Sequence, residues 1–303
     1  MVATGAIHRG QLILAEEPSL RFSRYAPDTE IQSLFFPLAA CVRKPLLQLS
    51  NCCGTDGNII DIVYTNAIPL TGTKDQAGLF ALASRINHAC NPNTNKSWSP
   101  ETGKMSFFAT RDIQPGEEIT STYIDELETY QDRQSHLSKM FRFACSCDLC
   151  SLDFPRRVCS DFHISDMKNV KKNLGGVLKG AGLGSRLPAI RHLLRLYDEQ
   201  SITDARVARA YSDAYKTAVR CRDGHRALVF SRRSAELFAE VEGEDGRQAK
   251  RMTGQAVQMQ KMVEEFAPPL PFEAGEESDD WLFMGGGFRE GGPVSEGAGL
   301  SWA

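Results

Sequence analysis

The segment that most constrains the fold is "FACSCDLC", which places Cys145, Cys147 and Cys150 within six residues. Three thiolates at this spacing can converge on one ion, because a loop that turns over so few residues brings their sulfurs together. A structural zinc site needs four ligands, so the fourth must come from another part of the chain. Spacing alone leaves several candidates open, namely Cys90, Cys159, Cys52, Cys53 or a histidine.

The composition favours metal ligands or buried thiols over disulfides for the nine cysteines. The chain has no run of about 18 apolar residues and no apolar signal segment at its start, so we expect no membrane span and an intracellular protein. Thiols stay reduced inside cells, so disulfides are not expected. The 303 residues, 42% of them hydrophobic, suit one large domain or two ordinary ones with a real core.

Charge is distributed unevenly along the chain. Residues 266–303 contain seven acidic residues and one base, a net charge of −6, which leaves +3 on residues 1–265 out of the total of −3. A near-neutral body argues against direct nucleic-acid binding. The acidic, glycine-rich tail at 266–303 is expected to be disordered, and Trp281, Leu282 and Phe283 within it form a candidate docking motif.

Residues 1–150 are typical of short strands and turns. We expect a strand in "QLILAEEP" (11–18), a β-branched strand over 59–70 after the turn at 55–58, a hairpin over 96–113, and a further strand after "QPGEE". A helical insertion is predicted over 30–50. The absence of regular alternation between strand and helix argues against a doubly wound sheet and favours an α+β fold.

After Cys150 the hydrophobic period changes to that of helices. Helices are predicted over 187–200, over 202–221 after a capping box from Ser201 to Asp204, and over 226–243. Small residues alternating with tyrosine and phenylalanine favour tetratricopeptide-like antiparallel pairs, although no clean repeat is present. "KGAGLGSR" (179–186) is interpreted as an interhelix linker, because no strand precedes it as a phosphate-binding loop would require.

Four motifs in the first 150 residues resemble those of one family. "ATGAIHRGQLILAEEP", "SRINHACNPN", "RDIQPGEEITSTYID" and "FRFACSCDLC" occur in the order in which SET-domain protein-lysine methyltransferases of the SMYD-like fungal group without a MYND finger carry their counterparts. The resemblance implies a SET fold of short β-sheets with a knot-like C-terminal segment and a zinc-binding post-SET loop. The expected organisation is a SET domain at 1–140 with a helical insertion at about 25–58, a post-SET segment at 141–160, an α-helical domain at 161–265 and the tail at 266–303.

The resemblance also assigns roles to residues. It implies that Cys90 completes the zinc site with Cys145, Cys147 and Cys150, and that Tyr123 is catalytic. Its remaining assignments are Ser84, Asn87, His88 and Phe143 for S-adenosylmethionine, and Asn66, Ile68 and Phe141 for the substrate channel. The implied substrate is a lysine of a histone or another protein, in the nucleus and/or cytoplasm, with a further protein partner possible on the helical domain.

Methyl transfer to lysine needs a neutral amine. A sulfonium about 4 Å from the amine, at an effective dielectric constant of about 20, disfavours the ammonium by about 4 kcal/mol, or about three pKa units. No dedicated base is therefore expected, and Glu117 and Glu118 are interpreted as structural residues. Phe141 stands where many relatives carry a tyrosine, so we hypothesise that it permits higher methylation states.

One departure from the family pattern concerns the cofactor. The family carries a G-x-G strand just before the segment that here begins "MVATGAI", and this sequence starts at that place. Glycines there let the backbone approach the cofactor. We therefore hypothesise that this chain binds S-adenosylmethionine weakly or not at all, and two functions compete: a lysine methyltransferase, or a zinc-stabilised SET scaffold that binds partners without turnover.

Overall fold

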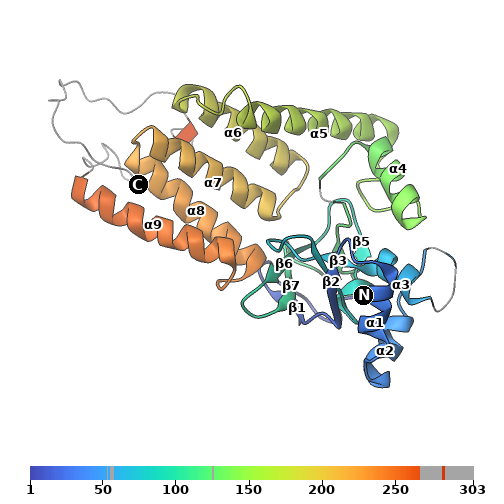
Figure 1. The fold of residues 1–303 in the computed structure, drawn as a ribbon. Helices are drawn as coiled ribbons and strands as arrows, with labels where there is room; N and C mark the ends of the chain where they lie inside the picture. The colour runs from blue at the N-terminus through green and yellow to red at the C-terminus, as the bar shows by residue number, and fades with distance from the viewer. Residues whose placement is uncertain (53, 55–57, 125, 267–281, 284–303) are drawn as a thin grey trace, which may run out of the picture.

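The computed structural model describes residues 1–52, 54, 58–124, 126–266 and 282–283. It comprises a β-rich N-terminal part and a helical C-terminal part, which lie side by side (Figure 1). Among the described helices, none is long and apolar enough to cross a bilayer.

Small sheets form the N-terminal part. The first, in the order β1-β7-β6, is antiparallel and contains β1 (Leu12–Glu16), β7 (Lys104–Ala109) and β6 (Thr94–Ser99). The predicted hairpin is confirmed, because β6 and β7 pair from Thr94 opposite Ala109 to Ser99 opposite Lys104. The second sheet, in the order β2-β4-β3, contains β2 (Leu20–Ser23), β4 (Gln76–Leu79) and β3 (Ile68–Pro69).

A third, two-stranded sheet joins segments about thirty residues apart. In it β5 (Asn87–His88) pairs in parallel with β8 (Thr120–Ser121). The chain start also lies against the β8 region, since Val2 bridges Glu118 and Ile119 N–H donates to Met1 O at 2.9 Å. A mainly aromatic and aliphatic core lies inside these strands, and its fully enclosed members are Phe80, Phe107, Ala109 and Ile113.

The insertion between β2 and β3 is helical. It contains α1 (Asp28–Phe35) and α2 (Ala40–Leu47), as predicted for 30–50. The strand predicted over 59–70 is wrong for most of its length, since α3 (Ile59–Asn66) occupies it and only Ile68–Pro69 is extended. The β-branched side chains also fit a helix here because Ile59, Ile62 and Val63 fall on one face at spacings of three and four and are buried beside α1.

After β8, the remaining elements of the described chain are helices. They are α4 (Tyr130–Phe141), α5 (Phe154–Gly175), α6 (Leu183–Glu199), α7 (Ala205–Arg220), α8 (Gly224–Glu242) and α9 (Arg247–Phe266). The predicted helices correspond to α6, α7 and α8. The predicted capping box is wrong, since the carboxylate of Asp204 accepts from Arg206 N–H, whereas Ser201 lies before the helix with φ of 51°. The glycine-rich segment is a linker only up to Gly182, because α6 begins at the next residue, Leu183.

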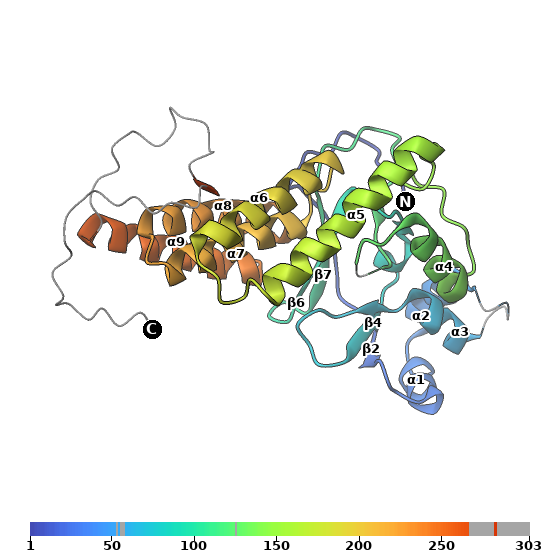
Figure 2. The same ribbon diagram turned by 90° about the horizontal axis from the view of Figure 1, so that it is seen from above.

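The helical part is docked on the first sheet by the end of α8. Gly243, with φ of 79°, lies so close to β7 that an added Cβ would come within 2.9 Å of the Phe108 ring. Arg9 forms an ion pair of 2.7 Å with Glu240, and the Asn95 amide donates to Val241 O at 2.9 Å. In Figure 2, α5 runs from α4 beside the sheets to α6 on the helical side, which provides a second connection.

Most of the acidic tail lies outside the described residues, and so does Trp281. Leu282 and Phe283 are described, and both are buried against the helical core. The Phe283 ring lies 5.3 Å from that of Phe230 on α8. Two residues of the candidate docking motif therefore pack on this chain's own helices.

Candidate functional site

A cavity of about 1560 Å³ lies between the sheets, the 141–152 loop, the first half of α5 and the end of α6. It brings together seven of the residues that the sequence suggested for cofactor, channel and catalysis: Asn66, Ser84, Asn87, His88, Tyr123, Phe141 and Phe143. Ile68 is not among its lining residues and instead packs against the core of the sheets. The helical part contributes a wall that the sequence did not indicate, including Arg156, His163 and Glu199.

The carboxylate of Glu16, at the end of β1, anchors one side of the cavity. Its two oxygens accept hydrogen bonds from the backbone N–H groups of residues 81, 82 and 83 at 2.7–3.1 Å. This holds the short 3-10 helix Ala83–Arg85, from which Ser84 Oγ donates to Asn66 O at 3.0 Å. The sequence alone does not indicate this role of Glu16, because a single acidic residue at a strand end forms no pattern.

Asn93 and Asn87 connect the β5 segment to the β8 segment. The buried Asn93 amide donates to Glu118 O at 2.8 Å and accepts from Thr120 N–H at 2.8 Å. Asn87 Nδ2 donates to Glu118 Oε1 at 2.7 Å. Two carboxamides of the "NHACNPN" segment therefore hold these paired segments together, and Glu118 orients Asn87.

Glu117 is held by three partners in the same region. Arg111 Nη2 lies 2.5 Å from its Oε1, Asn93 Nδ2 donates to the same oxygen at 3.1 Å, and Gln114 N–H donates to Oε2 at 3.1 Å. The hydrogen bond from Arg111 is the main reason why the pKa of Glu117 falls to about 2. The structural interpretation of Glu117 is consistent with these contacts.

Tyr123 lies in the wall of the cavity with its hydroxyl tethered. The hydroxyl donates to Ile86 O at 2.9 Å, and the ring lies 5.1 Å from Phe141 and 5.3 Å from His88. Burial, with a smaller contribution from Glu118, raises the pKa of Tyr123 to about 12. The phenol is therefore neutral near pH 7.

His88 uses both ring nitrogens within the protein. Its Nδ1 accepts from Tyr123 N–H at 3.0 Å, which places the ring proton on Nε2, 3.3 Å from Cys90 Sγ. Burial lowers the pKa of His88 to about 4. The ring is therefore neutral at pH 7 and lies between the backbone of Tyr123 and the cysteine cluster.

A left-handed residue directs two aromatic rings at the cavity. Arg142, with φ of 59°, ends α4 between Phe141 and Phe143. Because the chain turns at this residue, Phe141 lies against Tyr123 while Phe143 lies 6.1 Å from His88. A left-handed conformation is uncommon for a residue with a side chain, and it is typical of turns that must place their neighbours accurately.

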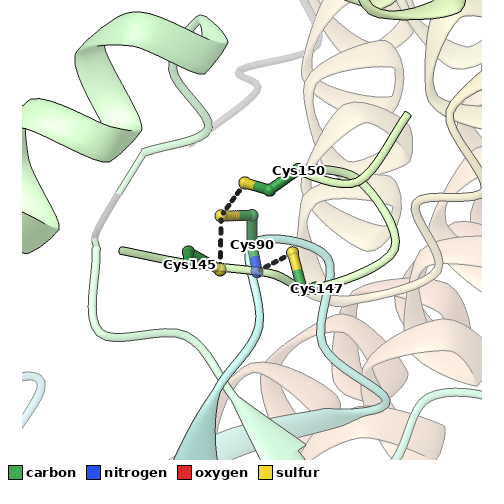
Figure 3. A group of neighbouring side chains, drawn as sticks. All are labelled: Cys90, Cys145, Cys147 and Cys150. Carbon is green, nitrogen blue, oxygen red and sulfur yellow. Dashed lines mark hydrogen bonds between the residues drawn. The ribbon is translucent and has the colours of Figure 1, made fainter. Parts of the chain in front are cut away.

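The four predicted cysteines meet beside this site. Cys90 Sγ lies 3.5 Å from Cys150 Sγ and 3.9 Å from Cys145 Sγ, and Cys90 N–H points at Cys147 Sγ at 3.5 Å. All four sulfurs lie within 4.8 Å of one another. In Figure 3, Cys90 reaches the cluster from its own segment, and the other three come from a single loop that curves around it.

The sulfur spacing fits a tetrahedral zinc ion. Zn–S bonds of about 2.3 Å in a tetrahedron imply S···S separations of about 3.8 Å, close to those observed. Hydrogen bonds to the Cys147 thiolate from the Cys150 and Cys90 groups lower the pKa of Cys147, and burial raises the pKa of Cys145 to about 12. A cation would favour the thiolate form throughout the cluster, so these residues could hold zinc.

Two of the other candidate cysteines have different neighbours. Cys52 Sγ contacts the Thr65 hydroxyl at 3.2 Å, and Cys159 lies on α5 with its Sγ 3.8 Å from His163 Nε2. Cys53 lies outside the described residues. Of the candidate cysteines that the structure describes, the fold therefore brings Cys90 to the loop.

Comparison with known proteins agrees with this arrangement. Residues 1–124 match the SET domain family. The histone-lysine N-methyltransferase set5 of Schizosaccharomyces pombe is 30% identical over 247 residues, which cover 81% of this chain and 76% of that protein. The protein-lysine N-trimethyltransferase SMYD5 of Homo sapiens is 35% identical over 97 residues, 30% of this chain and 23% of that protein. The chain therefore belongs to the SET-domain family of protein-lysine methyltransferases and is SMYD-like.

Proposed function

We propose that this chain transfers a methyl group from S-adenosylmethionine to the side-chain amine of a lysine in a histone or another protein. The observation that carries the proposal is the tethered Tyr123 hydroxyl, which lies in one cavity with Asn87, Phe141 and Phe143. The names of the relatives, histone-lysine and protein-lysine methyltransferases, support the same substrate class.

Ser84, Asn87, His88 and Phe143 would hold the cofactor, with Phe143 offering an aromatic face and Asn87 a carboxamide fixed by Glu118. When bound, S-adenosylmethionine supplies the methyl group and a positive sulfonium. His88 is unsuited to act as a base, because both its nitrogens are engaged and its pKa is about 4. The chain's contribution is therefore orientation of the amine and exclusion of water.

The substrate lysine would enter past Asn66 and Phe141, with Ile68 supporting this wall from the core. Phe141 lies beside Tyr123 without a hydroxyl of its own, which leaves space and removes one hydrogen-bond partner for the amine. We propose that this permits more than one methyl group on the nitrogen. The relative SMYD5 is named a trimethyltransferase, which is consistent with this proposal.

Three finer features of the fold complete the proposal. The parallel β5–β8 pair, with the chain start bridged to Glu118 beside it, supports a knot-like C-terminal segment of the SET fold. The four-cysteine cluster supports a post-SET zinc site. The stacked α7, α8 and α9 support a tetratricopeptide-like domain (Figure 1), for which we propose a protein partner of its own. Such an enzyme would act in the nucleus and/or cytoplasm.

The test is methyl transfer to core histones and to a cell extract, read by mass spectrometry. We expect Tyr123→Phe to lower the rate by about 10²-fold, the size of effect seen when one fixed hydrogen-bond donor is removed from an active site. Tyr25→Phe, which alters an exposed tyrosine, should leave the rate unchanged. Phe141→Tyr should shift the products toward monomethyl-lysine.

Calorimetry with S-adenosylmethionine separates the proposal from the scaffold alternative. Binding of the cofactor together with transfer that depends on Tyr123 supports the enzyme. A folded, zinc-loaded chain that neither binds S-adenosylmethionine nor methylates any protein would contradict it and favour a scaffold.

A further inference from the structure

A buried arginine lies beside the cysteine cluster. Arg133, on α4, is 1% exposed. Its Nη2 lies 3.7 Å from Cys150 Sγ, and its Nη1 donates to Glu128 O. Its Nε has no hydrogen-bond partner among the described residues. One of the few polar contacts of this fully enclosed guanidinium is therefore with a sulfur atom.

Burying a cation costs several kcal/mol unless an anion or a set of good acceptors compensates it. Among the described residues, Arg133 forms an ion pair with Asp161 on α5, whose Oδ1 is 4.0 Å from Nη1. That oxygen already accepts from Tyr130 N–H at 2.8 Å, and the side chain is 31% exposed. Asp161 is thus a partial counter-charge, shared with solvent and with the start of α4.

The cysteine cluster can supply the remaining compensation. Cysteines bound to zinc are thiolates, and four thiolates outweigh one divalent cation, so the loaded site keeps a net negative charge. A thiolate is also a much better acceptor for N–H than a neutral thiol, because charge-assisted hydrogen bonds are stronger. The same sulfur that the arginine approaches, Cys150 Sγ, belongs to the cluster.

We propose that Arg133 is a positioning residue of the metal site: its Nη2 donates to the Cys150 thiolate, and its charge offsets the excess negative charge of the zinc–cysteine cluster. This inference rests on the proposed zinc site. The guanidinium also holds Glu128 O, which lies just before α4, and it faces Asp161 on α5. The metal is thereby connected to the junction between the sheets and the helical part, where α4 and α5 meet (Figure 2).

The test uses the full zinc-loaded chain and measures zinc per chain and the rate of zinc release to a chromogenic chelator. Arg133→Met keeps most of the volume and removes the charge and the donor. We expect release at least about tenfold faster, since partners of metal ligands typically contribute 10–100-fold to affinity. Arg133→Lys keeps the charge but not the planar fork, and should release zinc at an intermediate rate.

Arg226 is the matched control, because it is equally buried, 1% exposed, and pairs with Asp223 at 2.9 Å in the helical part. Arg226→Met should retain zinc like the wild type, while Cys90→Ser provides the reference for a broken site. Circular dichroism checks that each variant is folded. If Arg133→Met does not fold, the Arg133→Lys rate relative to wild type decides the question.

A second readout depends on the hydrogen bond itself. With Co²⁺ in place of zinc, loss of an N–H···S bond should move the sulfur-to-metal charge-transfer band of Arg133→Met to lower energy. If the Arg133 variants bind zinc as the wild type does, release it at the same rate and show an unshifted band, the role of Arg133 is overturned and the zinc site stands. A wild-type chain that binds no zinc would overturn the metal site, and this role with it.

Discussion

The His88 side chain connects the tyrosine of the cavity to the cysteine cluster. Its two ring nitrogens contact Tyr123 N–H and Cys90 Sγ, and its ring faces both Tyr123 and Phe143. The sequence assigned it to the cofactor through a motif, but the fold also makes it the link between the tyrosine and the cysteine cluster. That double role cannot be read from the sequence, because it depends on Tyr123, 35 residues away, and on the tautomer that its N–H group selects.

At the same scale, Glu117 makes stability depend on pH. Its pKa in the folded protein is about 2, below the ordinary value of 4.5, so its contribution is fully present above about pH 4.5 and is lost as pH falls toward 2. We expect Glu117→Gln to lower the free energy of unfolding at pH 7 by about 1–2 kcal/mol. In urea titrations, the gap between variant and wild type should narrow between pH 4.5 and pH 3.

Glu101→Gln is the control for this pH series, because Glu101 is 73% exposed and its Lys250 partner is 3.5 Å away. Its unfolding free energy should match the wild type at every pH. A constant gap for Glu117→Gln across the series would show that the lost charge is not the cause.

At the scale of elements, α3 shows that residue type alone does not predict secondary structure. Its sequence, "IIDIVYTN", is rich in β-branched residues, yet it is helical because several of them face one core and Asn58 caps its start. The Asn58 Oδ1 accepts from Ile60 N–H at 3.0 Å. Residue propensity is a weak local preference, and burial of a whole helix face outweighs it.

The cap gives a direct test of α3. Asn58→Ala should lower the free energy of unfolding by about 1 kcal/mol, the usual cost of losing an N-cap. Asn58→Asp should retain the stability, because a carboxylate also caps and favours the positive end of the helix. Urea unfolding of both variants measures this, and equal stability of the alanine and aspartate variants would contradict the capping role.

At the scale of the whole molecule, the large cavity exists because two parts of the chain are docked. Its walls come from the sheets on one side and from α5 and α6 on the other. The junction relies on the close approach of Gly243 to the Phe108 ring, together with the Arg9–Glu240 ion pair. Stability of the junction is therefore coupled to the shape of the site.

Gly243→Ala tests this junction. An added methyl would meet Phe108 at 2.9 Å, and φ is 79°, so we expect a loss of about 2–4 kcal/mol from overpacking and backbone strain together. Gly103→Ala is the control: φ is 67° but no atom lies within 4 Å of the added Cβ, so a loss of about 1 kcal/mol is expected.

Thermal unfolding of the single variants and of Gly243→Ala with Phe108→Leu separates the two causes. If the contact with the ring causes the loss, Phe108→Leu should restore part of the stability that Gly243→Ala removes, so the two effects should not be additive. Strict additivity would assign the loss to backbone strain alone.

The sequence by itself determined the features whose cause is local. The hairpin of β6 and β7, the amphipathic helices α7 and α8, and the three-cysteine loop all depend on neighbours within a few residues, so spacing and period predict them. Motifs also indicated the cavity residues Ser84, Asn87, His88, Tyr123, Phe141 and Phe143, because each motif is a short run of consecutive residues.

Tertiary structure decided what depends on distant partners. It brought Cys90 to within 3.5 Å of Cys150, made α3 helical against α1, packed Ile68 against the core of the sheets and buried Arg133 beside a sulfur atom. In each case the deciding energy is burial or charge compensation between residues far apart in the chain. Local propensity carries no information about such partners, because they become neighbours only when the sheets, the loop and the helices pack together.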